Sequence, residues 1–357
     1  MKKRCPYSHL LTRRSFLKST VAAAAITGIN PTFLFADEGK KSVAKSIVAV
    51  VEDKKAITDN FSIDAKLARA MVDEAIKRIT NTKSISEAWV KIFPNLKENE
   101  VIGIKPNCVN WRIPSHPEVV YSIADSMAEA GIKKENILIW DNVEGFLEKS
   151  GYKINKGKEG YKCYGTFIGK GAENIGLDPE AKVFIKSENF ERTHSKILSQ
   201  HIDYLINVPV LKSADSPGVT GVTLSLKNMY GTISIAEQAS VGLYPPDMPE
   251  AFDKMHRHHC NPQIAEVNAS EHLMKKTKLV VIDALAGVFN GAPSSPPQGV
   301  SHKIVMSTDR VAADIVGMGI INEKRREMKI PEVSHEAAGH IWSAEKMGLG
   351  TTNAEII

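Results

Sequence analysis

Short apolar runs alternate along the chain with segments whose apolar residues recur every three to four positions. The runs 46–51, 101–104 and 136–140 have the length of buried strands, whereas 64–80 and 117–130 carry the apolar stripe of a helix that covers a sheet. Strands that are joined by such helices are usually parallel and buried on both faces. The pattern therefore predicts an α/β fold with a mostly parallel, Rossmann-like sheet and helices on both faces.

Capping signals predict where two of these helices begin. Pro117 suits a first helical position, where its missing N–H costs nothing, and Gly131 ends the same segment. The order Ser84-Ile85-Ser86-Glu87 is a capping box, which predicts a further helix that begins directly after Ser84.

The alternation is interrupted once. Residues 143–176 are rich in glycine and lysine and lack a clear period, which predicts a loop-rich insertion with little regular structure. We expect the pattern to resume with strands at 182–185, 204–208, 219–226 and 279–282 and with helices at 263–274 and 310–320. Residues 37–357 are enough for one large domain or for two joined lobes.

Residues 1–36 have the order of a twin-arginine export signal. Arg13 and Arg14 stand directly before Ser15-Phe16-Leu17-Lys18, and a mildly apolar run, 21–29, follows. This run is much shorter than the roughly 20 apolar residues that span a membrane, and Ala36 offers a small residue for cleavage. The sequence predicts export to the periplasm by the twin-arginine translocase and no membrane span in the remaining chain.

The export segment carries most of the positive charge. The sequence has 46 Lys and Arg against 41 Asp and Glu, and residues 1–36 hold six of the basic residues and none of the acidic ones. The rest of the chain therefore has 46 − 6 = 40 basic and 41 acidic residues, a charge of −1. This balance gives no reason to expect a nucleic acid as a partner.

Cysteine usage argues against a disulfide framework and an iron–sulfur cluster. Cys108, Cys163 and Cys260 follow the export segment, and no C-x-x-C pair occurs. An odd number of cysteines cannot all pair within one chain, and a cluster held by cysteines of this chain alone would need four.

Polar residues directly follow four of the predicted strands. Ligands of open α/β sheets bind beyond the carboxyl ends of the strands, so we expect these side chains to converge on one site. The alternative for each is a plain turn former at the end of a strand. The residues are Lys105, Asn107, Asp141, Lys212 and Asp283.

Lys227 and Asn228 interrupt an apolar run that begins at Val222. A lysine in such surroundings is rarely buried without a partner. It therefore reaches a surface, forms a structural ion pair or meets an anion in a pocket. Together with Lys105 and Lys212 it could fix a carboxylate or a phosphate, and a desolvated lysine could also act as a base or nucleophile.

Two isolated histidines are further candidates. His116 precedes Pro117 at the start of a predicted helix, where an anion can bind, or it simply caps the helix. His194 is a candidate for proton transfer, as is Asp283, with a surface role as the alternative for His194.

The segment 255–260 concentrates side chains that bind metals. An extended chain would place His256 and His258 on one face, and a helix would do so for His256 and Cys260. Either arrangement predicts a divalent transition-metal site of zinc, iron, nickel or copper with further ligands from elsewhere. The alternative is a polar loop. The candidate ligands are His256, His258, His259 and Cys260.

Several blocks of the sequence resemble a family catalogued as domain of unknown function 362. They occur in family order across most of residues 47–322, so the resemblance covers residues 37–357 as one domain with that core. The blocks are Ile102–Asn107, Asp203–Lys212, Leu226–Gly231, Val281–Asp283 with Gly287, Gly291–Pro293, Gly299 and Ser307–Asp314.

The resemblance implies little about chemistry. Members of the family often carry ferredoxin-like segments or twin-arginine leaders, and this chain lacks the cysteine-rich part. Ser213 and Ala214 follow Lys212 where the family has a Lys-x-His element. The layout is also distantly similar to the nickel-dependent lactate racemases, at the level of the fold alone.

Two functions follow from these features. The first is an exported enzyme that acts on a small anionic substrate, with or without the help of a metal. The second is a non-catalytic protein of the periplasm that binds a metal or a metabolite or assists maturation. Both predict the same basic crevice.

Overall fold

The computed structural model describes residues 45–214, 219–233, 235 and 237–357. The predicted export signal lies outside the described residues. Among the helices of the described part, none is both long enough and apolar enough to cross a membrane.

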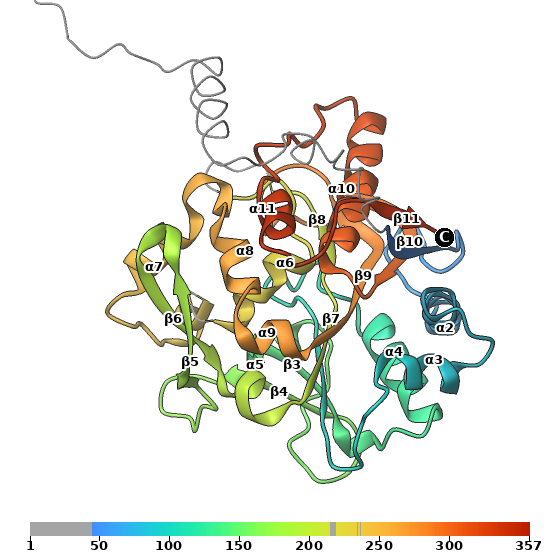
Figure 1. The fold of residues 1–357 in the computed structure, drawn as a ribbon, viewed down its shortest axis with the longest axis horizontal. Helices are drawn as coiled ribbons and strands as arrows, with labels where there is room; N and C mark the ends of the chain where they lie inside the picture. The colour runs from blue at the N-terminus through green and yellow to red at the C-terminus, as the bar shows by residue number, and fades with distance from the viewer. Residues whose placement is uncertain (1–44, 215–218, 234, 236) are drawn as a thin grey trace, which may run out of the picture. The chain divides into compact units, whose positions relative to one another are not determined.

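Nine strands of the described chain form one central sheet (Figure 1). Strand β10 (Gly299–Ser307) runs antiparallel to its neighbours β1 (Ser46–Glu52) and β9 (Thr277–Val288), and the other pairings are parallel. The order is β11-β1-β10-β9-β7-β2-β3-β4, with β8 beside β9. The remaining strands are β2 (Ile102–Lys105), β3 (Ile137–Val143), β4 (Lys162–Phe167), β7 (Tyr204–Asn207), β8 (Val210–Lys212) and β11 (Ala354–Ile356).

Both faces of the sheet are covered. Successive side chains of a strand point to opposite faces, so Ile137 and Ile139 of β3 join one apolar core and Leu138 and Trp140 join the other. The first core includes residues of α2 (Ala65–Thr80), α3 (Ile85–Ile92) and α4 (Pro117–Glu129). The second includes residues of α6 (Ser225–Asn228), α7 (Met248–His256), α8 (Gln263–Asn268), α9 (Glu271–Lys276), α10 (Arg310–Glu327) and α11 (His340–Lys346). The predicted α/β class with a mainly parallel sheet is confirmed.

The capping signals mark the helix starts correctly. The Ser84 hydroxyl accepts a hydrogen bond from the Glu87 amide at 3.2 Å, and α3 begins at the next residue. Pro117 is the first residue of α4. Local side-chain chemistry decides these boundaries, so the sequence is sufficient to place them.

The stretch 143–176 contains more regular structure than the sequence predicts, although most of it is irregular. It contains α5 (Glu144–Lys149) and β4, which pairs with β3 along the edge of the sheet. The predicted strand 182–185 exists within β5 (Leu177–Ile185), but β5 pairs with β6 (Phe190–Ser195) outside the central sheet. Glycine and lysine do not prevent an edge strand, whose pairing depends on its neighbour rather than on its own apolar period.

Two further elements differ from the prediction. The run 219–226 forms no extended strand, since Val222 makes an isolated bridge with Ser213 and α6 begins at Ser225. The predicted helix 263–274 is divided into α8 and α9. A short apolar run fits a buried turn or helix as well as a strand, and spacing alone does not distinguish them.

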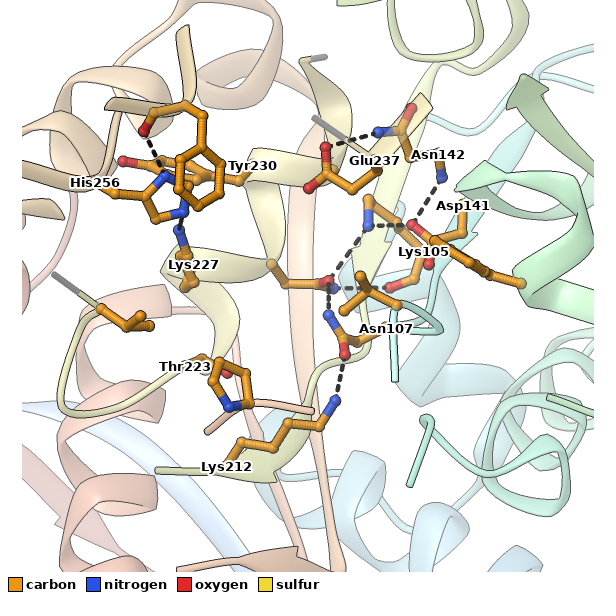
Figure 2. A pocket seen from close by; sticks show the side chains of 17 residues that line it. Lys105, Asn107, Asp141, Asn142, Lys212, Thr223, Lys227, Tyr230, Glu237 and His256 are labelled. Carbon is orange, nitrogen blue, oxygen red and sulfur yellow. Dashed lines mark hydrogen bonds and ion pairs between the residues drawn. The ribbon is translucent and has the colours of Figure 1, made fainter. Parts of the chain in front are cut away.

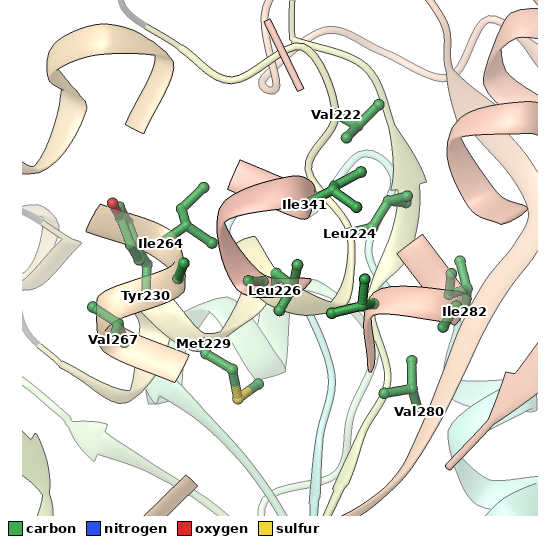
Figure 3. Packing of buried hydrophobic residues seen from close by; sticks show 14 of the residues in the cluster. Val222, Leu224, Leu226, Met229, Tyr230, Ile264, Val267, Val280, Ile282 and Ile341 are labelled. Carbon is green, nitrogen blue, oxygen red and sulfur yellow. The ribbon is translucent and has the colours of Figure 1, made fainter. Parts of the chain in front are cut away.

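Helix α6 is too short to be stable alone and is held by its surroundings. Its Leu226 packs in the core with Ile264 of α8 and Ile282 of β9 (Figure 3). The amides of Ser225 and Leu226 donate to the Asp314 carboxylate of α10 at 2.8 and 3.0 Å. Burial raises the pKa of Asp314 to about 7, although these hydrogen bonds act in the opposite direction. The contacts fix the direction of the two residues at the end of α6, Lys227 and Asn228.

Candidate functional site

A cavity of about 270 Å³ lies where β2 and β8 end, beside α6 and α7 (Figure 2). We call the charged and amide side chains of its lining the floor, and the apolar side chains the wall. The charged lining residues are Lys105, Lys212, Lys227, Asp141 and Glu237; the other polar ones are Asn107, Asn142, Thr223 and Asn228; the rest are Val109, Phe146, Val219, Tyr230, Gly231, Phe252, His256 and Pro293.

Lys105 and Asp141 form a buried ion pair at one side of the floor. The Lys105 ammonium lies 2.8 Å from Asp141 Oδ1 and also donates to Asn228 Oδ1 and to the Pro106 carbonyl, both at 3.3 Å. Because an ammonium has three hydrogens, these contacts use its whole capacity. Asp141 also accepts from the amides of Cys108 and Asn142, each at 2.8 Å. This pair therefore holds the surrounding groups of the floor in place, and its two charges cancel.

Three asparagines connect the ion pair to the rest of the floor. Asn228 donates to Asn207 Oδ1 at 2.8 Å, and its own Oδ1 accepts from Asn107 Nδ2 at 3.1 Å. Asn207 in turn donates to the Ser225 carbonyl at 2.7 Å. The amides thus tie β2 and β7 to α6 and hold the floor in one arrangement.

Gly231 permits the ion pair to lie against the 3₁₀ helix Met229–Thr232, which follows α6. A Cβ atom at this position would lie 2.7 Å from the Lys105 ammonium and 3.3 Å from Asp141 Oδ1. The first distance is too short for a Cβ contact and the second is tight, so a side chain at this position would displace the Lys105 ammonium from its contacts.

Lys212 is a buried lysine with an uncharged partner. Its ammonium donates to Asn107 Oδ1 at 2.7 Å, and no salt bridge joins it to any described residue. Burial lowers the pKa of Lys212 to about 7, although the charges of Cys108, Asp141 and Asp283 act to raise it. An amine with such a pKa exchanges protons readily near neutral pH.

Lys227 lies on the other side of the floor, with no carboxylate of the described chain within ion-pair distance. Its ammonium is 3.3 Å from His256 Nε2, 3.6 Å from Cys260 Sγ and 3.5 Å from the centre of the Tyr230 ring. It forms no salt bridge within the described chain, and burial lowers its pKa. Lys227 is partly buried, so its charge is partly removed from water without a carboxylate in return.

His256 is held as a neutral acceptor beside Lys227. Its Nδ1 donates to the Phe252 carbonyl at 2.8 Å, which leaves the lone pair of Nε2 for the lysine. Burial lowers the pKa of His256 to about 3, and the nearby Lys227 acts in the same direction. The imidazole therefore stays uncharged at physiological pH.

The cavity brings together seven of the predicted residues. They come from β2 and the loop after it, from β3, from β8, from α6 and from the end of α7, as expected of groups at one edge of a sheet. These residues are Lys105, Asn107, Asp141, Lys212, Lys227, Asn228 and His256.

His116 and Asp283 form a separate pair that does not line the cavity. Asp283 is fully buried, and its Oδ2 lies 2.7 Å from both the Nδ1 and the amide nitrogen of His116. Burial lowers the pKa of His116, but the Asp283 carboxylate outweighs it and the net shift is upward. The pair fixes the start of α4, where the sequence predicts either an anion site or a residue that simply caps the helix.

His194 lies apart from the cavity in the core. It is fully buried on β6, with Nδ1 3.0 Å from the Thr232 hydroxyl and Nε2 2.8 Å from the Ser270 hydroxyl. Burial lowers the pKa of His194 to about 3. Both ring nitrogens are engaged in cross-links between elements, and the expected proton transfer has no support in this position.

The predicted metal ligands do not form a metal site in the described chain, where no three His, Cys, Asp or Glu side chains lie close enough to share an ion. His256 and Cys260 face the Lys227 ammonium, a charge that repels a cation. His259 contacts the Val219 carbonyl, and His258 is exposed. The segment turns through left-handed backbone from His258 to Cys260, which spacing alone does not reveal.

Sequence reasoning missed Glu237, Tyr230 and Phe252 as lining residues. Glu237 accepts from Asn142 Nδ2 at 3.4 Å, and Phe252 stacks on His256 with ring centres 4.3 Å apart. Their sequence neighbourhoods carry no strand that ends at the site. The available signal was the order Lys-Asn-Met-Tyr-Gly from Lys227 onwards, which already placed Tyr230 beside a candidate lysine.

Comparisons with known proteins identify a family but no function. The model of the family described as "Domain of unknown function (DUF362)" matches residues 102–319. No curated protein matches the chain. A crystal structure of a protein from Thermotoga maritima is similar, with 14% identity and a TM-score of 0.36, over 68% of this chain and 57% of that one. The chain thus spans just over half of that protein, and a similarity this low carries no argument.

Proposed function

The chain belongs to the family of domain of unknown function 362, and we propose that it is an enzyme that acts on a small organic anion in this cavity. Lys227 holds the anionic group of the substrate. Lys212 accepts and returns a proton during the reaction. The Lys105–Asp141 pair and the asparagines keep both lysines in place.

The observation that carries the proposal is the presence of two lysines at one cavity whose partners are uncharged. Lys212 and Lys227 contact an amide oxygen, an imidazole, a thiol and an aromatic ring. A cation withdrawn from water is stabilised by an anion, and the described side chains do not supply one within ion-pair distance. The charges of Lys105 and Asp141 cancel. The remaining charged groups of the lining are two lysines, Lys212 and Lys227, and one carboxylate, that of Glu237. The cavity therefore attracts a negative ligand.

The proton-transfer role of Lys212 follows from its pKa. An amine that is half protonated near pH 7 can take a proton from a bound molecule and return it at little cost. Ordinary lysines, with a pKa above 10, stay protonated and cannot act as a base. The neighbouring Asn107 oxygen orients the amine towards the cavity.

Proton transfer is tested by solvent exchange. The purified protein is incubated in D₂O with a panel of 2-hydroxy, 2-oxo and 2-amino acids, and deuterium incorporation is followed by NMR. We expect one class of acid to exchange a carbon-bound hydrogen with the wild type, and Lys212→Met to lower that rate by at least about a hundredfold, within the usual range for loss of a general base.

One result contradicts the role of Lys212, and another contradicts the enzymatic role. Exchange at the wild-type rate in Lys212→Met would assign the base elsewhere. An acid that binds tightly to the wild type and never exchanges would favour the alternative, a protein that carries a metabolite without transforming it. The folded state of the variant is checked by its melting temperature.

We further propose that the protein acts in the periplasm after export by the twin-arginine route. The support is the order of residues from Arg13 to Lys18 and the short apolar run after it. Replacing Arg13 and Arg14 by lysine retains the charge but removes the recognised pair, and we expect the variant to stay in the cytoplasm of a bacterial host. Cell fractionation measures this, and periplasmic recovery of the variant equal to that of the wild type contradicts export by this route.

A further inference from the structure

The wall of the cavity is apolar where its floor is charged. Val109, Phe146, Val219, Phe252 and Pro293 all contribute carbon surface to the lining. A small inorganic anion would leave this apolar surface uncovered, because it carries no carbon that could pack against it.

Two of these apolar side chains have a large part of their surface in contact with water. Phe252 is 52% exposed and Val109 is 46% exposed, and both line the cavity. Apolar surface in contact with water costs about 25 cal/mol for each Å² relative to a covered state. An apolar group placed in the cavity would remove this surface from water.

The rings of Phe252 and His256 form a stacked pair directly beside Lys227, here called the shelf. Their rings stack with centres 4.3 Å apart and an angle of 28° between the planes. The bond from His256 Nδ1 to the Phe252 carbonyl fixes the pair within α7. Because His256 Nε2 is 3.3 Å from the Lys227 ammonium, the shelf begins where the predicted anion site ends. Figure 2 shows His256 and Lys227 next to each other on the same side of the cavity.

The shelf is uncharged, so it does not compete for the anionic group. The imidazole donates its N–H to the Phe252 carbonyl and accepts from Lys227. Both ring nitrogens are therefore already in hydrogen bonds within the protein. A ligand in contact with the shelf therefore meets aromatic and aliphatic carbon. Such a surface favours an apolar, preferably planar group over a polyhydroxylated one, whose hydroxyls would lose their water without new partners.

We propose that the substrate is an amphipathic organic acid, with its carboxylate on Lys227 and an apolar body against Phe252, Val109 and Val219. This inference rests on the proposed function, because it names the class of anion that the same cavity takes. It excludes inorganic phosphate and sugar phosphates as preferred ligands of the site.

Calorimetric titration with acetate, butanoate, hexanoate, phenylacetate and inorganic phosphate at pH 6.5 tests the inference. Each methylene that becomes covered is expected to tighten binding roughly fourfold, so hexanoate and phenylacetate bind far more tightly than acetate or phosphate. Phe252→Ala is expected to weaken hexanoate and phenylacetate roughly tenfold and to leave acetate within about twofold.

Phe184→Ala is the matched control, since Phe184 is 57% exposed and does not line the cavity. It should bind every probe as the wild type does. Equal affinities for acetate and hexanoate, or for wild type and Phe252→Ala towards hexanoate, overturn the amphipathic substrate while the anion site stands. Failure of all five probes to bind overturns the proposed anion site itself.

Discussion

Replacing Lys227 by methionine is expected to weaken the binding of hexanoate by ten- to a hundredfold, because one charge-assisted hydrogen bond contributes about 1.5–3 kcal/mol. Methionine preserves most of the apolar stem and removes the charge. Calorimetry at pH 6.5 measures the affinity. The loss should occur without destabilisation, since the lysine has no carboxylate partner in the described chain and its pKa is already lowered by burial.

The melting temperature distinguishes a binding role from a structural one. We expect Lys227→Met to melt at the wild-type temperature or slightly above it, because removing a desolvated cation relieves a cost. Lys346→Met, at an exposed position on α11, is the control and should change neither quantity. A variant that melts several degrees lower with unchanged affinity would make Lys227 a structural residue and contradict the proposed anion site.

The affinity for hexanoate is expected to fall as the pH rises above about 7. The positive charge of protonated Lys212 at the same cavity favours a bound anion, and the pKa of this buried amine in the free protein is about 7. Below that pH the ammonium is already present and the affinity is constant. Above it, the affinity falls by up to about tenfold for each pH unit, because the charge of Lys212 is progressively lost. The exchange reaction has the opposite dependence, since a base acts in its neutral form.

Lys212→Arg is the variant that isolates this effect. A guanidinium remains charged throughout the accessible pH range, so the slope above pH 7 should disappear even if the bulkier side chain weakens binding at every pH. Titrations between pH 5.5 and pH 9.5, with hexanoate ionised throughout, provide the profile. A slope that persists in Lys212→Arg would assign the titration to another group.

The polar floor of the cavity could largely be predicted from the sequence. Lys105 and Lys212 end strands, and the topology of a parallel sheet brings such ends to one edge whatever the details of packing. Lys227 was recognisable because a lysine within an apolar run needs a partner. These inferences depend on local order and on general rules of topology, which a single sequence contains.

The wall of the cavity and the Glu237 carboxylate could not be predicted. Phe252 lies on α7 and Glu237 begins the short 3₁₀ helix Glu237–Val241, and neither is adjacent in sequence to a strand that ends at the site. Their positions depend on how the segment after α6 folds back over the sheet. Exposed apolar residues are common, so a sequence does not show that a phenylalanine borders a cavity.

The histidines show a second limit. His194 and His116 have the right chemistry for proton transfer, yet one is cross-linked to Thr232 and Ser270 in the core and the other is paired with Asp283. The candidate metal ligands show the same limit: His256 and Cys260 both face the Lys227 ammonium, and spacing does not predict the left-handed backbone at His258 and His259. Residue type identifies what a group can do, and packing decides whether it does so.

The anion site is the central claim, and calorimetric titration of hexanoate at pH 6.5 tests it most directly. The experiment compares the wild type with Lys212→Met/Lys227→Met, a variant that leaves the Lys105–Asp141 pair intact. The account predicts saturable binding at one site in the wild type and no measurable binding in the variant, with similar melting temperatures for the two proteins. Equal binding by both proteins, or no binding by the wild type, would contradict it.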